Sequence, residues 1–150
     1  RILAVFPDVK MLHVVRSPFT GFADMRRRHS TIQASSYALK WTHVNTVALH
    51  WAGKYPESFR LVMLDELLSN RRVAMTRVAE WLGIEFQECL LNPSWDGELI
   101  EGLILPFGGV STRSLSDERK LESSNSSVEK GELDALTLAT RTLLGEFSSK

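Results

Sequence analysis

Two short apolar runs stand out in the pattern of hydrophobic and polar positions, at residues 10–15 and 59–63. Nearly continuous apolar character over such a short run is typical of a parallel strand covered on both faces. After the first run, Ser17 is placed to cap a helix and Pro18 to stand in its first turn. An amphipathic segment then continues to about residue 28. The pattern therefore predicts a strand, a tight turn and a helix.

A longer helix is predicted over residues 37–55, because apolar and aromatic side chains recur there at helical spacing. We expect this face to belong to the core rather than to stack on a ligand, since the spacing alone explains it. His43 and His50 are interpreted as residues of the surface or the core edge, because they lack a third metal ligand nearby. The apolar face consists of Tyr37, Trp41, Val44, Ala48, Trp51 and Tyr55.

The order of strand, helical crossover and second strand predicts a βαβ unit with parallel strands and a right-handed connection. Beyond it, a helix is predicted over residues 71–82. Ser69 or Asn70 is placed to cap this helix, and Gly83 to end it.

Asp65 and Glu66 lie between the second strand and this helix. Carboxylates at such a position cap the amino end of a helix or pair with cations in its first turn. We expect this structural role for both, with Arg71 or Arg72 as the cation.

The last part of the chain has a different pattern. Residues 84–109 are interrupted by proline and glycine and are predicted to be irregular. Residues 111–127 carry almost no large apolar side chain and are predicted to form a mobile loop. A final helix is predicted to begin at a capping box formed by Ser126 and Glu129 and to continue through Phe147.

The composition is that of an ordinary globular protein, with 43% hydrophobic and 24% charged residues among 150. Its 18 basic residues balance 18 acidic ones, which argues against a nucleic-acid-binding protein, because such a protein normally carries a basic excess. A single cysteine, Cys89, excludes an internal disulfide and a cysteine-based zinc site. No apolar run has the length of a membrane span. Because Arg1 enters what reads as a helix-to-strand connection, we expect residues 1–150 to be part of one larger domain.

The clearest candidate for chemistry is Arg16, at the carboxyl end of the first strand and beside the next helix. Open α/β sheets place anionic ligands at this point. The alternative is an arginine that caps the sheet edge and pairs with a carboxylate. Three further cations, Arg26, Arg27 and Arg28, end the same helix.

The segment FPDVKMLHVVRSP, residues 6–18, resembles the FPDAKFIHLVRDP segment of the PAPS-dependent sulfotransferases. In that family the arginine at the strand end binds the 3′-phosphate of the nucleotide. Further segments resemble the family in the same order, so the resemblance covers nearly the whole chain. They are Trp41 with Asn45, residues 60–86 (similar to vryEDLvadPeatlrrlaefLGlpf), residues 92–97 (similar to ptwnG), residues 106–111 and the last helix.

The resemblance implies a three-layer α/β domain of the P-loop-kinase type with a parallel central sheet, present here as an incomplete C-terminal part. It implies an enzyme that transfers the sulfuryl group of PAPS to a hydroxyl or amine and leaves PAP. A carbohydrate and a protein tyrosine are candidate acceptors. By the family's pattern, Arg16 binds the 3′-phosphate, Arg28 matches a second phosphate-binding arginine, and Ser111 lies in the loop that closes over the nucleotide.

Two departures from the family bear on function. The glycine-rich 5′-phosphosulfate loop has no counterpart in the chain, and the catalytic base normally lies upstream of Arg16, so none is assigned. Asp24 stands where the family usually has a serine that donates to the 3′-phosphate. Its carboxylate would repel a phosphate unless Arg28, one helical turn on, neutralises it. Two hypotheses follow: the nucleotide side of a sulfotransferase, or a degenerate non-catalytic domain that binds a partner or an anionic ligand.

Overall fold

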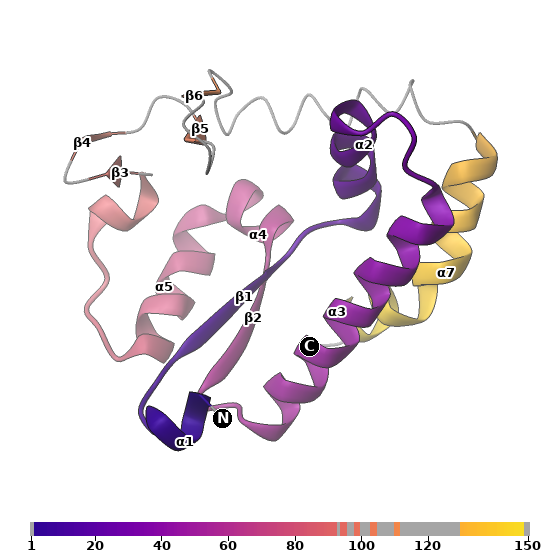
Figure 1. Cartoon of the computed structure of the whole chain (residues 1–150). Helices are drawn as coiled ribbons and strands as arrows, with labels where there is room; N and C mark the ends of the chain where they lie inside the picture. The colour runs from indigo at the N-terminus through magenta and orange to yellow at the C-terminus, as the bar shows by residue number, and fades with distance from the viewer. Residues whose placement is uncertain are drawn as a thin grey trace. The chain divides into compact units, whose positions relative to one another are not determined.

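The computed structural model describes residues 2–92, 94–95, 98–99, 103–104, 110–111 and 130–148. The chain divides into two compact units. The first unit combines Arg1–Asp65 with Asn125–Lys150, and the second is Glu66–Ser124. Within the described residues, the fold is mixed α/β, with one parallel pair of strands and six α-helices (Figure 1).

The first unit is built on a two-stranded parallel sheet, as the two apolar runs predict. Strand β1 (Met11–Val15) pairs with β2 (Phe59–Met63), and the register runs from Met11 opposite Phe59 to Val15 opposite Met63. Helices α2 (Pro18–Arg28) and α3 (Ala34–Lys54) connect the two strands. A four-residue helix, α1 (Ile2–Val5), precedes β1. The predicted βαβ connectivity is confirmed.

The boundaries of α2 are those predicted, but the predicted cap is not formed. Pro18 occupies the start of the helix, and the side chain of Ser17 makes no capping hydrogen bond. Instead, the Ser17 carbonyl oxygen accepts hydrogen bonds from the Gly21 amide at 3.0 Å and the Thr20 hydroxyl at 3.3 Å. Helix α3 begins at Ala34, before the predicted start, because the buried Ala34 joins the core despite its polar neighbours.

The core of the first unit depends on α7 (Lys130–Ser148), a helix far away in the sequence that packs along α3 (Figure 1). Leu136 and Leu143 lie two turns apart, so they point to the same side of α7. Leu136 packs with Phe22, and Leu143 packs with Val15 and Trp41. The hydroxyl of the buried Thr140, between the two leucines, donates to the Leu136 carbonyl oxygen at 2.8 Å.

The prediction that β1 is covered on both faces is wrong for this chain. The side chains of Leu12 and Val14, which point to one face, are 43% and 46% exposed. The prediction for the α3 face is correct only in part, because Trp41 and Ala48 are buried whereas Val44 is 52% exposed. Both differences have one cause. An apolar pattern shows that a strand or helix can be covered, but the number of covering elements is set by tertiary structure.

The second unit contains α5 (Arg71–Leu82), which has its predicted boundaries. Gly83 adopts φ 75° and ends this helix, as predicted, since glycine enters the left-handed region without steric cost. The Ile84 amide donates to the Ala79 carbonyl oxygen at 3.1 Å, which completes the glycine cap. Asn70 flanks α5 without a side-chain capping hydrogen bond, so its predicted cap is not formed.

The predicted pairing of Glu66 is also corrected. Asp65 and Glu66 both lie inside an additional helix, α4 (Leu64–Ser69). Glu66 accepts from Arg77 at 2.6 Å, and Arg72 pairs instead with Glu88 of the 3₁₀ helix η1 (Glu88–Leu91). The expected pairing of Glu66 with Arg71 or Arg72 is therefore absent among the described side chains.

Two minimal antiparallel pairs lie in and just beyond the stretch predicted to be irregular, and the second pair includes Ser111, the first residue of the predicted mobile loop. Strand β3 (Ser94–Trp95) pairs with β4 (Glu98–Leu99), and β5 (Leu103–Ile104) pairs with β6 (Val110–Ser111). The rest of the predicted mobile loop, residues 112–127, and the predicted capping box lie outside the described residues. Among the described helices, none has the length and apolar character needed to span a membrane.

We predict that the Leu136→Ala variant loses about 2–5 kcal/mol of unfolding free energy, because truncation leaves a cavity between α2, α3 and α7. Chemical denaturation monitored by circular dichroism measures this loss. Leu138→Ala is the matched control, since Leu138 lies on the same helix and is 80% exposed. Its expected change is within about 0.5 kcal/mol. Equal losses in the two variants would contradict this account of the core.

Candidate functional site

The candidate site begins where β1 ends, and α3 fixes that point through side-chain hydrogen bonds. The Trp41 indole donates its Nε1–H to the carbonyl oxygen of Arg16 at 2.9 Å. One turn further along α3, Asn45 Oδ1 lies 3.1 Å from Nε2 of His13, on β1 itself. Asn45 Nδ2 donates to the Trp41 carbonyl oxygen at 2.8 Å, which orients the amide. The strand end is thus held to the helix at two positions.

Asp24, on α2, is the centre of the site. Its carboxylate is buried and accepts hydrogen bonds from three guanidinium groups. Arg28 reaches Oδ2 at 2.6 Å and Arg27 reaches Oδ1 at 2.5 Å, while Arg16 reaches Oδ2 at 3.4 Å. Arg27 and Arg28 lie three and four positions after Asp24, which is the spacing at which helical side chains meet. Arg16 comes from the strand end. The carboxylate is therefore neutralised, which is one of the two outcomes that the sequence left open for Asp24.

The balance of charge at Asp24 favours an anion. Three cations and one carboxylate leave an excess of positive charge, and the arginines are more exposed than the carboxylate that they share. The side chain of Asp24 is 12% exposed, against 26% for Arg16 and 56% for Arg28. A ligand arriving from solvent therefore meets guanidinium groups first. Guanidinium forks match the geometry of phosphate and carboxylate oxygens.

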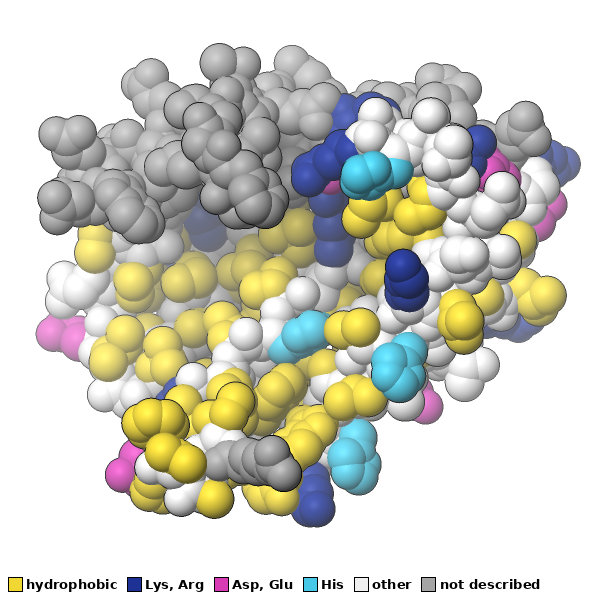
Figure 2. Space-filling view, in the orientation of Figure 1, with side chains coloured by type: hydrophobic (Ala, Val, Ile, Leu, Met, Phe, Trp, Pro, Cys, Tyr) yellow, Lys and Arg dark blue, Asp and Glu magenta, His cyan; other side chains and the backbone are white. Residues whose placement is uncertain are grey.

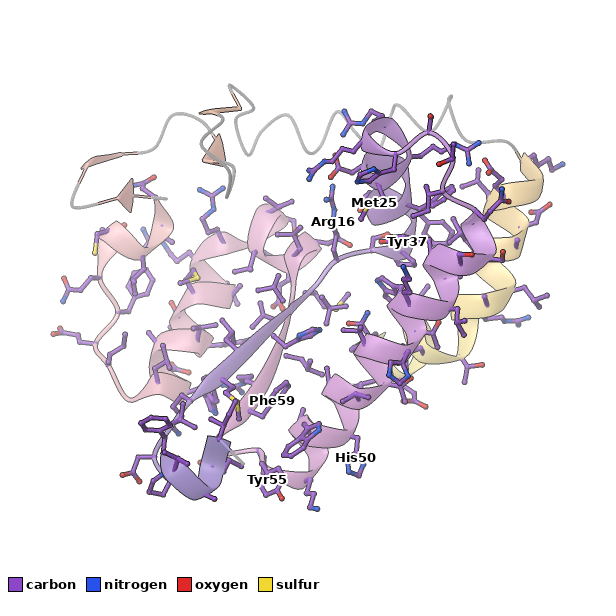
Figure 3. All side chains as sticks on the ribbon, viewed as in Figure 1. Arg16, Met25, Tyr37, His50, Tyr55 and Phe59 are labelled. Carbon is purple, nitrogen blue, oxygen red and sulfur yellow. The ribbon has the colours of Figure 1, made fainter. Side chains whose placement is uncertain are left out.

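Tyr37 lies close to Arg16 (Figure 3). Gly21, on α2, lies beside both side chains. A Cβ atom built on Gly21 would lie 2.1 Å from Tyr37 Oη and 3.9 Å from Arg16 Cδ. A side chain at this position of α2 would therefore displace the phenol, whereas its separation from the arginine would be an ordinary contact. Burial raises the pKa of Tyr37; Arg16 nearby lowers it and Asp24 raises it. The phenol thus remains a neutral hydroxyl next to the charged groups.

The three consecutive arginines divide between two roles. Arg26 Nη1 donates to the Ile32 carbonyl oxygen at 2.7 Å and to Glu132 Oε1 at 2.8 Å. These contacts fasten α2 to the following turn and to α7. Arg27 and Arg28 point to Asp24 instead. Only the second and third arginines of the run therefore belong to the candidate site.

The structure brings together three of the four residues that the sequence nominated: Arg16, Asp24 and Arg28. Ser111 lies in β6, in the other unit. The sequence interpretation missed Arg27, although its spacing from Asp24 was a visible signal. It also counted Tyr37 as core alone. An isolated glycine inside a helix often has a packing reason, so Gly21 was the signal that another group lies close to α2.

No metal centre is formed by the described side chains, since no three of His, Cys, Asp and Glu gather among them. His43 and His50 are exposed on α3, as their interpretation as surface residues predicted. Comparison of the chain with models of known protein families, with curated proteins and with solved structures finds no match in any of the three.

We predict that Tyr37 ionises only above the usual tyrosine pKa of about 10. Titration of tyrosinate absorbance in the protein and in Tyr37→Phe isolates this residue, because Tyr55 is the only other tyrosine. Since the pKa is raised in the folded state, the stability due to Tyr37 is complete below the unfolded pKa. It is lost as the pH rises through the folded value. A difference titration with a midpoint below 10 would contradict the burial of the phenol.

Proposed function

We propose that this chain supplies the 3′-phosphate side of a PAPS site in a sulfotransferase. The observation that carries the proposal is the convergence of Arg16, Arg27 and Arg28 at the carboxyl end of β1. In open α/β sheets, ligands bind beyond the carboxyl ends of the strands. The resemblance of residues 6–18 to the sulfotransferase phosphate segment names the ligand. The proposed full domain is a three-layer, P-loop-kinase-like fold with a larger parallel sheet.

In this function the arginines bind and orient the nucleotide rather than act on the sulfuryl group. Their positive charge pairs with the 3′-phosphate, and Tyr37 and Arg16 lie together beside Gly21. The reaction breaks the S–O bond to the nucleotide phosphate and forms an S–O bond to the acceptor, whose proton passes to a base. Such a transfer depends mainly on positioning and charge stabilisation, by analogy with phosphoryl transfer. The acceptor is proposed to carry a hydroxyl group, as a carbohydrate or a protein tyrosine does.

Asp24 determines how a phosphate would bind. The carboxylate and a phosphate compete for the same guanidinium groups, so binding requires at least one arginine to turn from Asp24 toward the ligand. Arg16 makes the longest of the three contacts, at 3.4 Å, beyond the usual range of a charge-assisted hydrogen bond. It is therefore the arginine that turns at least cost, while Arg27 and Arg28 keep Asp24 neutralised. Ser111 is proposed to close over the same nucleotide, by the family's pattern alone.

The same contacts favour a second candidate function. If Asp24 holds all three arginines permanently, PAP does not bind to them, and the domain is a degenerate, non-catalytic one that binds a partner or another anionic ligand. The two candidates differ in the affinity for PAP and in the effect of removing the Asp24 charge.

We predict that the full-length protein binds PAP and that Arg16→Ala weakens this binding about 10–100-fold, because a charge-assisted contact to the phosphate is lost. Isothermal calorimetry measures both affinities. Arg141→Ala, at an exposed position of α7, is the control variant and should bind as the parent does. Adenosine 5′-phosphate, which lacks the 3′-phosphate, should show no dependence on Arg16. If the parent protein does not bind PAP, the proposed sulfotransferase function is wrong.

We predict that Asp24→Asn, which keeps the shape and removes the charge, binds PAP about 3–10-fold more tightly at low salt. Because the three arginines then lack a counter-charge, its unfolding free energy should fall by about 1–3 kcal/mol. PAP should restore more of the melting temperature in this variant than in the parent. Asp24→Ser tests the same point with the residue usual in the family. Weaker PAP binding by both variants would favour the non-catalytic candidate.

A further inference from the structure

The hydroxyl group of Tyr37, in the first turn of α3, has a place in the site that packing alone does not explain. Its ring is fixed in the core, because it packs with Phe22 at a centroid distance of 5.5 Å and contacts both buried clusters of the first unit. Among the residues that the structure describes, however, no hydrogen bond involves the hydroxyl. A tyrosine hydroxyl that is removed from bulk water usually has a hydrogen-bond partner.

This hydroxyl lies next to the basic side chains of the candidate site. In the space-filling view, basic side chains gather over α2 and the end of β1 (Figure 2). Tyr37 Oη and Arg16 Cδ both lie within 4 Å of one point, the place of a Cβ atom built on Gly21. The guanidinium group of Arg16 begins one bond beyond Cδ, so an anion that this group binds can also reach the phenol.

The groups already at the site do not offer the hydroxyl an acceptor. Asp24 Oδ1 accepts from Arg27, and Oδ2 accepts from Arg28 and Arg16. Guanidinium groups donate hydrogen bonds and cannot accept them. Burial raises the pKa of Tyr37, so its hydroxyl stays protonated at neutral pH and is available as a donor. The hydroxyl therefore requires an acceptor, and a bound anion would supply one.

We propose that the Tyr37 hydroxyl donates a hydrogen bond to the 3′-phosphate that Arg16 binds, an assignment that rests on the proposed function. A phosphate monoester has three terminal oxygen atoms that accept hydrogen bonds strongly. An arginine that binds in the bidentate mode occupies two of them, and the third remains for another donor. Tyr37 adds a neutral donor from a second helix, so the phosphate is held from two directions. It takes no part in the transfer of the sulfuryl group itself.

Gly21 is the residue of α2 that leaves room for this contact. A Cβ atom at this position would lie 2.1 Å from Tyr37 Oη, but 3.3 Å from Cζ of the same ring. The collision is therefore mainly with the hydroxyl oxygen, and a phenylalanine at position 37 would remove it. Substitution of Gly21 thus moves the hydroxyl without changing Arg16 or Asp24.

Isothermal calorimetry of PAP binding to the full-length protein tests the contact. Tyr37→Phe keeps the ring and removes the hydroxyl, so we expect it to weaken PAP binding about 10-fold, through the loss of a hydrogen bond to a charged group. Adenosine 5′-phosphate, which lacks the 3′-phosphate, should bind this variant and the parent equally. Tyr55→Phe is the matched control, since Tyr55 is the only other tyrosine, and it should bind PAP as the parent does.

The outcomes separate this inference from the proposed function. If the parent binds PAP and Tyr37→Phe binds it equally well, the hydroxyl contact is wrong and the proposed function stands. An equal loss of affinity for both nucleotides also overturns the contact, because it would not involve the 3′-phosphate. If the parent does not bind PAP, the proposed function is wrong and this inference is wrong with it.

A double-mutant cycle tests whether Gly21 acts through the hydroxyl. Gly21→Ala should weaken PAP binding in the parent, because it displaces the phenol. It should have little further effect in Tyr37→Phe, where the colliding oxygen is absent. Gly53→Ala, on α3, is the matched control, since a Cβ atom there meets nothing within 4 Å. Circular dichroism verifies that each variant folds. An equal effect of Gly21→Ala in both backgrounds overturns the proposed geometry.

Discussion

The carboxylate of Asp24 is the counter-charge on which the end of β1 depends. Arg27 and Arg28 extend from the same helix, and Arg16 approaches from the strand. Two like charges about 4 Å apart near a protein surface repel by about 4 kcal/mol, so the three guanidinium groups could not gather without an anion. In the protein alone, Asp24 is that anion. The arrangement holds the cations together, at the price of a carboxylate in the place where a phosphate is proposed to bind.

The surrounding fold makes this arrangement rigid from two sides. On the strand side, the Trp41 indole holds the Arg16 carbonyl oxygen, which fixes the backbone from which the arginine starts. On the helix side, Arg26 ties α2 to Glu132, and Phe22 is buried against Leu136. Helix α7 therefore supports the site although none of its residues contributes a charge to Asp24. Residues close together in the sequence supply the charges, and α7, which is far away in the sequence, helps to position them.

The sequence predicted those features that local chemistry decides. Pro18 begins α2 and Gly83 ends α5 because the backbone preferences of proline and glycine act without help from neighbours. The apolar runs located both strands for the same reason. The start of α3 was predicted late, because the burial of Ala34 depends on Phe22 and Leu136. Within the site, the spacing of one helical turn from Asp24 predicted Arg28 as a partner of that carboxylate. Gly21 indicated a close neighbour, but the sequence could not identify it as Tyr37, since the two helices meet only through tertiary packing.

The place of the proposed phosphate site depends on where β1 ends rather than on the rest of the strand. The site uses Arg16, the residue that follows β1, so it requires that the strand ends where Trp41 holds its backbone. Asn45, one turn further along α3, contacts His13 of the same strand. Helix α3 therefore aligns the strand from which Arg16 starts, and the guanidinium group reaches Asp24 from a backbone that is held at two positions.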